Sequence, residues 1–445
     1  MTIYQDEKNG LNNKPTLNND DYKKFSSSIY SIRAISAILI LILHFAWWSA
    51  PWFNANLIYH PFLFVRIFFD LTDMGVDLFT ILSSLFLTIN ILMTSNDYIS
   101  WPKWYKRRIT RIFPILWLTL AIVLPTVLII GNSLPNTLYY DANSIIINLS
   151  GLGGLNGTLI LTYQWFISFI LSCYLIFPLY FIFMKKNFRL TSIITIASFI
   201  VCAIIFYNIN IYFPNLNDLW FGIARYFEFF FGALIGYWIA KENLVNLRYF
   251  KEKLMGIFSI ISLLISSSVY ILSFSFSFHF LGQRIYERFI CIPIMATSLI
   301  LFLTYLFMNR PSLNKPFKKL GKMNYEMYLL EGFPWEITIF IMFGLFSLPI
   351  YFAPLAFLIY VLFDILLAYP WNYIGNIIAQ KRKLDNGIVI IAGSLMIYAI
   401  SEMFLRNVID LRANFILPFV ILAIIVTILL IIYIIIRKEK SKKGV

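Results

Sequence analysis

Arg33 and His44 are the residues whose types and spacing first suggest chemistry in this chain. They lie in the apolar stretch from Tyr30 to Trp48, which is long enough to cross a membrane as a helix. A charge inside a bilayer costs roughly 2.5–3.5 kcal/mol on insertion scales, so each residue is a functional candidate. Their separation of eleven residues is close to three helical turns, so both side chains point in nearly the same direction. Because imidazole titrates near neutral pH, His44 is a candidate general base.

Both residues also have a structural interpretation. Arg33 lies near the predicted cytoplasmic end of the span, where a long side chain can extend to the lipid headgroups. His44 lies roughly 16 Å further along the helix, so its structural alternative is a hydrogen-bonded interior histidine. The other two histidines, His60 and His279, fall outside the predicted spans. We therefore expect His44 to be the catalytic histidine.

The second apolar run begins with the acids Asp73 and Asp77. Asp77 lies just inside the predicted outer edge, where its carboxylate can hold His44 in one tautomer, as in a hydrolase triad. The alternative is an acid that caps the helix start and interacts favourably with the helix dipole. Asp77 is therefore a third candidate catalytic residue.

Arg108 and Arg111 precede the third apolar run. Residues three apart share one face of a helix, so the two guanidinium groups can bind a single phosphate group. The alternative is the ordinary positive charge found beside spans on the cytoplasmic side. The pair is a candidate site for an anionic substrate.

Further charges lie within the sixth and ninth apolar runs. Arg225 and Glu228 are three residues apart and can form an ion pair that lowers the cost of burying both. Glu326 is near the cytoplasmic end of its span and is expected to be solvated, whereas Glu331 is deeper. In the sixth run the glycines at 232 and 236 form a small-residue face that suggests helix packing.

The elements that position these residues are membrane helices. The chain has 445 residues, of which 60% are hydrophobic and 13% are charged, against about 25% charged in soluble proteins. Only helices or closed barrels satisfy backbone groups in lipid, and these runs are too long for barrel strands. The apolar runs are 29–49, 74–94, 111–131, 160–183, 190–210, 219–240, 255–277, 286–308, 324–345, 350–372, 387–406 and 414–436. The cysteines at 173, 202 and 291 have no metal-binding spacing.

Charge in the loops predicts the topology. Lysine and arginine gather before the first run and in 103–111, 185–189, 241–253, 310–322, 381–383 and 437–443. The positive-inside rule then places both termini in the cytoplasm. This alternation accounts for most of the net charge of +14, so no nucleic-acid partner is needed. We expect 132–159 to be a flexible outer loop.

Three segments follow from this organisation. Residues 1–28 form a polar cytoplasmic tail without the apolar core of a signal peptide. Residues 29–383 form a ten-helix core that holds all the candidate residues. Residues 384–445 form an additional helix pair with a basic cytoplasmic tail. The predicted fold is therefore an all-α polytopic membrane protein.

Five short patterns occur in order along the core. They are Arg33 with His44; Gly75, Val76, Asp77, Leu78, Phe79, Leu82 and Ser83; Arg108, Arg111, Ile112, Phe113 and Pro114; Trp165, Tyr174, Leu175 and Pro178; and Arg225, Glu228, Phe229 and Gly232. In this order and at these depths the chain resembles the bacterial membrane-bound acyltransferase 3 family, whose members O-acylate surface glycans and related molecules. The resemblance covers residues 30–375.

Three positions depart from the family pattern. Ser84 stands where glycine is usual, Ser168 begins a stretch where many relatives carry a Glu pair, and Glu331 stands where a histidine is usual. The departures at Ser168 and Glu331 leave the acceptor and the path of the proton open.

The resemblance implies an O-acyltransferase that uses acyl-CoA, with acetyl-CoA the expected donor and no permanently bound cofactor. In this interpretation Arg108 and Arg111 bind the donor phosphates, the thioester passes Arg33, and His44 activates an acceptor hydroxyl or receives the acyl group. The acceptor is a surface polysaccharide or its lipid-linked precursor in the cell membrane. Trp165, Arg225, Glu228 and Glu331 are further candidate site residues.

Two other functions remain open. Twelve spans with both ends inside also fit a transporter or flippase of an envelope glycan, and buried charges mark substrate paths. No repeat between the two halves supports that alternative. The departure at Glu331 also leaves open a catalytically idle scaffold or receptor for acylated glycans.

Overall fold

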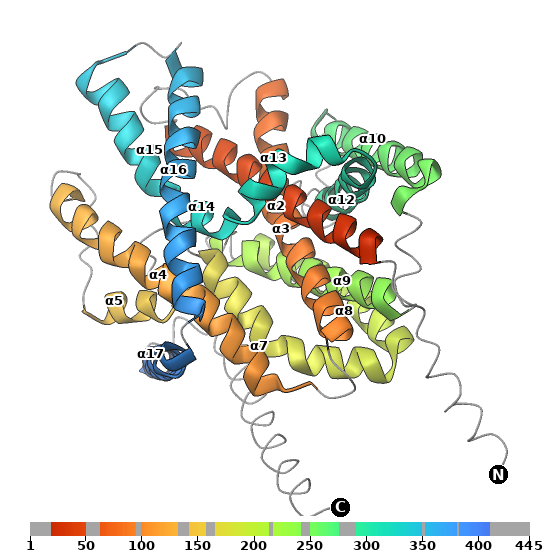
Figure 1. The fold of residues 1–445 in the computed structure, drawn as a ribbon, viewed down its shortest axis with the longest axis horizontal. Coiled ribbons are helices and arrows are strands. Elements are labelled where there is room, and N and C mark those ends of the chain that lie inside the picture. The colour runs from red at the N-terminus through yellow and green to blue at the C-terminus, as the bar shows by residue number, and fades with distance from the viewer. Residues whose placement is uncertain are drawn as a thin grey trace, which may run out of the picture. The chain divides into compact units, whose positions relative to one another are not determined.

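In the computed structural model, every regular element among the described residues is a helix (Figure 1). These residues are 19–49, 63–94, 99–131, 142–156, 165–212, 217–241, 250–275, 291–348, 352–380 and 382–409. No strand occurs within these ranges. The predicted all-α class is therefore confirmed for the described part of the chain.

In the described part of the chain, ten long helices carry ten of the twelve predicted apolar runs. They are α2 (Asn19–Ser49), α3 (Leu63–Thr94), α4 (Trp101–Gly131), α7 (Trp165–Lys186), α8 (Phe188–Tyr212), α9 (Asn217–Lys241), α10 (Lys253–Ser275), α12 (Ile292–Asn309), α16 (Ala353–Gln380) and α17 (Arg382–Ile409). Within the described residues, 6 helices are long and apolar enough to cross a membrane. The run predicted at 414–436 lies outside the described residues.

Large apolar side chains cover the outside of several of these helices. Ile193 of α8 is 64% exposed, Leu264 of α10 is 62% exposed and Leu366 of α16 is 70% exposed. Contiguous exposed apolar surface of this kind is unfavourable in water and marks contact with lipid or a partner. Together with the long apolar helices, these outer faces are those of a multi-pass membrane protein.

The ninth predicted span is not one continuous helix. The structure divides it into α14 (Asn324–Leu330), α15 (Gly332–Ile339) and the π-helix η7 (Phe340–Leu345). The break lies at Glu331, which is followed by Gly332 and, two residues after Gly332, by Pro334. Proline cannot donate a backbone hydrogen bond, and glycine is a poor helix former, so together they end α14.

Two segments interpreted as loops contain helices. The expected outer loop holds α5 (Ala142–Leu149) and the short α6 (Gly153–Asn156), joined through Gly151 with a φ of 74°. The basic segment after α12 forms α13 (Pro311–Gly321). Its prolines and lysines made it resemble a cytoplasmic loop, but it packs against α2.

The chain forms two compact units, and the first holds residues 1–97, 189–328 and 338–365. Within it α3 packs against both α2 and α9, and α12 packs against α2, α3 and α10. A Cβ added at Gly236 of α9 would lie 2.5 Å from the carbonyl oxygen of Leu85 of α3, and one at Gly232 would overlap Ser84. These close approaches confirm the packing interpretation of the two glycines.

The second unit holds residues 98–188, 329–337 and 366–445. Within it α17 packs against α4 and α5, and α6 packs against α7. Lys106 Nζ donates a hydrogen bond to Asn386 Oδ1 over 2.8 Å, and Tyr398 Oη donates to Asn143 Oδ1 over 2.5 Å. The first helix of the predicted C-terminal pair is therefore tied to the same unit as α4.

Candidate active site

Arg33 and His44 both lie on α2, in the first unit. Arg33 is 9% exposed, and its guanidinium carbon lies 5.9 Å from the ring centre of Tyr30 and 5.5 Å from that of Phe86. Cations at this distance are attracted to an aromatic face. The Arg33 side chain therefore packs against protein, mostly shielded by α2 and α3, instead of extending to headgroups.

His44 is buried near the other end of α2. It is 8% exposed and is the only histidine among the described residues. The next residue, Phe45, lies against α16: its ring centre is 5.3 Å from that of Phe357 and 5.7 Å from that of Tyr360. Within the first unit, α16 therefore covers α2 at the level of His44.

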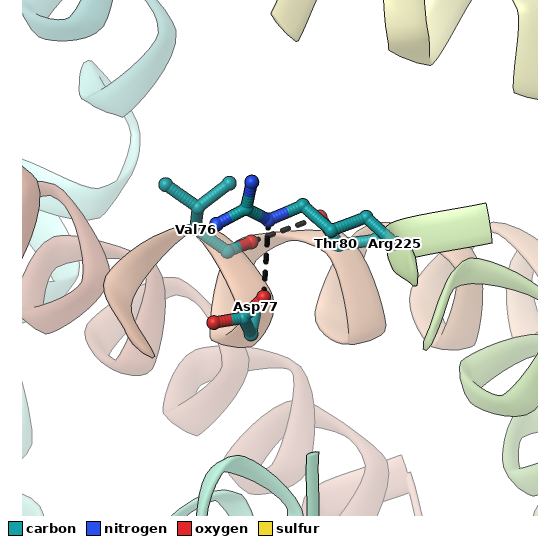
Figure 2. Close-up of polar contacts among 4 residues, drawn as sticks. All are labelled: Val76, Asp77, Thr80 and Arg225. Carbon is teal, nitrogen blue, oxygen red and sulfur yellow. Dashed lines mark hydrogen bonds and ion pairs between the residues drawn. The ribbon is translucent and has the colours of Figure 1, made fainter. Parts of the chain in front are cut away.

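Asp77 and Arg225 form a buried ion pair between α3 and α9 (Figure 2). Arg225 Nε donates to Asp77 Oδ1 over 3.0 Å, and the two residues are 2% and 3% exposed. One turn further on, Thr80 Oγ1 donates to the carbonyl oxygen of Val76 over 2.8 Å. The second carboxylate oxygen of Asp77, Oδ2, is buried without a hydrogen-bond partner among the described residues. The pair thus joins two helices and leaves one acceptor unused.

This geometry changes the role expected for Asp77. One interpretation of the sequence was that its carboxylate holds His44; in the described structure this carboxylate accepts a hydrogen bond from Arg225 Nε. Arg225 pairs with Asp77 on another helix. The sequence had predicted a partner on its own helix, Glu228. The cause is the close approach of α9 to α3 at the glycines Gly232 and Gly236, which the spacing of charges along each helix does not reveal. Glu228 is itself 1% exposed.

Arg108 and Arg111 lie together on α4, in the second unit. The guanidinium carbon of Arg108 lies 5.5 Å from the ring centre of Trp104 and 5.9 Å from that of Tyr174 on α7. Burial lowers the pKa of Arg108, Tyr174 opposes that shift, and Arg111 adds to it. Arginine nevertheless remains protonated at neutral pH. Arg111 is exposed, so the pair presents one half-buried and one exposed cation.

Trp165 begins α7 and is half-buried beside the turn that leads into α6. A Cβ added at Gly154 would lie 2.7 Å from Trp165 Cα. Ser168 Oγ accepts a hydrogen bond from the backbone N–H of Gly154 over 2.9 Å and donates to the carbonyl oxygen of Gly151 over 2.8 Å. Ser168, which departs from the family pattern, therefore fixes this turn against α7.

Glu326 and Glu331 are both buried. Glu331 is 0% exposed and lies at the break between α14 and α15, as its predicted depth required. Glu326 is 7% exposed, so its interpretation as a solvated acid is wrong. Glu326 lies on α14, the short helix that replaces the start of the expected long span, and it is surrounded there by protein atoms.

The candidates fall into two groups. Arg33, His44, Asp77, Arg225 and Glu228 lie in the first unit, and the structure brings Asp77 and Arg225 into contact. The candidates of the second unit are Arg108, Arg111, Trp165 and Glu331.

Sequence reasoning missed one buried acid, Asp364 of α16. It is 0% exposed and lies one turn after Tyr360, which packs against Phe45. The signal was present, because Asp364 is the single charge in the apolar run at 350–372.

The fold and these buried charges define a multi-pass helical membrane protein with ionisable groups inside its helix packing. The chain belongs to the acyltransferase 3 family: a family model described as an acyltransferase domain matches residues 27–373. The matched region ends within α16 and leaves α17 outside it. Comparisons with curated proteins and with solved structures gave no significant match.

Proposed function

We propose that the protein is an integral membrane O-acyltransferase. It moves an acyl group, with acetyl the expected one, from cytoplasmic acyl-CoA to a hydroxyl of a cell-surface polysaccharide or its lipid-linked precursor. The observation that carries this proposal is His44, a buried histidine in an apolar helix of an acyltransferase-family chain. Buried ionisable groups in membrane helices are costly and are kept for function.

In the proposed reaction His44 acts as the general base. It takes the proton of the acceptor hydroxyl, and the acceptor oxygen attacks the thioester carbonyl and forms the ester bond. The bond from the carbonyl carbon to sulfur breaks, and the CoA thiolate leaves and takes up a proton. In the covalent variant His44 receives the acyl group first and passes it to the acceptor.

The other candidate residues bind and position the substrates. Arg108 and Arg111 bind donor phosphates, since guanidinium groups suit phosphate recognition. Arg33, buried among aromatic rings on the same helix as His44, faces the donor. Asp77 acts through Arg225: the ion pair fixes α3 against α9 in the unit that holds His44.

Reconstitution tests this function directly. The purified protein is placed in liposomes with labelled acetyl-CoA inside, and transfer to protein or to added acceptor is measured. We expect His44→Ala and Arg33→Ala to lose transfer activity. In His44→Ala the rate of transfer should fall by roughly 10²–10⁴-fold, the usual contribution of a general base. His60→Ala, outside the predicted spans, is the matched control and should retain activity.

Two outcomes would contradict the proposal. Full turnover by the His44→Ala variant would exclude the base mechanism. Movement of a labelled glycan across the bilayer without acyl transfer would instead favour the transporter or flippase. A comparison of ester-linked acetyl on surface glycans with and without the gene would then identify the acceptor.

A further inference from the structure

One face of α13 holds this helix firmly on α2. Asn314 Nδ2 donates to Ser27 Oγ over 3.0 Å, and Ser31 Oγ donates to the backbone carbonyl of Asn314 over 3.0 Å and also to its Oδ1. At the end of α13, Gly321 lies directly against the backbone carbonyl of Tyr30, where a Cβ would overlap it. The position of α13 on α2 is therefore fixed between residues 27 and 31.

A second face of α13 carries positive charge. At about 100° per residue, Lys315, Lys318 and Lys319 fall within an arc of about 100° on α13. We name these three residues the lysine face. Lys315 and Lys319 are exposed and Lys318 is half-buried. No acidic residue occurs within α13 itself.

The edge of α13 opposite the lysine face is apolar. It consists of Leu313, Pro316 and Leu320, and Leu313 is 49% exposed. A short helix with cations on one side and exposed apolar residues on the other is the pattern of a helix that lies in a membrane interface.

The depth of α13 agrees with that position. It contacts α2 at Ser27–Ser31, between the charged start of α2 at Asp20–Lys24 and the long apolar stretch that follows. In a spanning helix this boundary marks the level of the headgroups.

We propose that α13 lies at the bilayer surface and that its lysine face binds the phosphates of anionic phospholipid headgroups. The lysines supply the charge complementarity, and the exposed apolar edge favours a lipid over a soluble phosphate. Tyr30, which touches Gly321, also has its ring beneath the Arg33 guanidinium. Lipid binding on α13 therefore stabilises the part of α2 that carries Arg33. This inference stands independently of acyl transfer.

Hydrogen–deuterium exchange of residues 311–322 tests the inference on the full-length protein. The protein is placed in nanodiscs of phosphatidylcholine, with or without phosphatidylglycerol. We expect exchange to slow by about fivefold or more in the anionic discs, since each lysine near such a surface contributes about that factor. Soluble glycerol phosphate added to neutral discs should not reproduce the effect.

Matched variants separate the lysine face from general positive charge. The triple variant Lys315→Gln, Lys318→Gln, Lys319→Gln should lose most of the response and keep normal exchange of α3 in neutral discs, because it leaves the contacts with α2 intact. The control variant, Lys103→Gln, Lys185→Gln, Lys186→Gln, removes the same charge elsewhere and should respond like the wild type. Equal exchange of wild-type α13 in both discs, or an undiminished response of the first triple variant, would overturn the proposal.

Discussion

Breaking the ion pair between Asp77 and Arg225 should be among the most destabilising single changes in the first unit. At the 3.0 Å between Nε and Oδ1, two unit charges attract by about 5.5 kcal/mol at an effective dielectric constant of 20. Removing one partner of a buried pair typically costs about 3–5 kcal/mol, because the other charge keeps its desolvation penalty. We therefore expect Asp77→Asn and Arg225→Met each to lower the free energy of unfolding by about that amount.

The double variant gives the sharper result. With both charges gone, neither partner of this pair is left as an uncompensated ion, so Asp77→Asn with Arg225→Met should be more stable than either single variant. Thr80→Val is the matched control: Thr80 lies one turn from Asp77, and its hydroxyl donates to the carbonyl oxygen of Val76 on its own helix. It should change stability by about 1 kcal/mol or less.

Equilibrium unfolding in detergent or bicelles, followed by helical circular dichroism, measures these differences. A thermodynamic cycle over the two single variants and the double variant then isolates the coupling between Asp77 and Arg225. Single variants as stable as the wild type would refute the reasoning, as would strictly additive losses. Either result would mean that Arg225 is balanced by groups other than Asp77.

Two further predictions concern packing and donor binding. Gly232→Val should lower the free energy of unfolding by about 1–3 kcal/mol or more, because the new side chain overlaps Ser84 and the carbonyl of Ile81. Gly387→Ala is the control, because a Cβ at Gly387 meets nothing within 4 Å. If the Gly232→Val variant were as stable as the control variant, the close packing of α9 on α3 at Gly232 would be contradicted. Arg108→Leu should raise KM for acetyl-CoA about tenfold, which is the lower end of the effect expected when a hydrogen bond to a charged group is lost. Its effect on kcat should be smaller. The exposed Arg107→Leu variant should keep the normal KM, and an unchanged KM in Arg108→Leu would exclude Arg108 as a phosphate ligand.

Apolar length was enough to predict where most helices lie. It failed at the ninth span, where Gly332 and Pro334 interrupt a continuous apolar run and leave Glu331 at the break. It also failed at α13, because a short helix with prolines and lysines has the composition of a loop. Tertiary contacts with α2 overrule that local preference.

The candidate residues were recognisable because charge is rare in apolar runs, but their partners were not. Asp77 and Arg225 are 148 residues apart, and no spacing rule connects two separate helices. Rules such as three or four residues apart describe neighbours on one helix, which is why Glu228 was the partner expected for Arg225. The cation–π contacts of Arg33 with Phe86 and of Arg108 with Tyr174 escaped prediction for the same reason.

The separation of Asp77 from Arg225 also has a consequence for biogenesis. A ribosome adds about 5–20 residues per second, so Arg225, 148 residues further along the chain, is added roughly 7–30 s after Asp77. During that interval the Asp77 carboxylate has no Arg225 to pair with. The nascent chain must therefore keep α3 near water or the insertion machinery until α9 enters the bilayer.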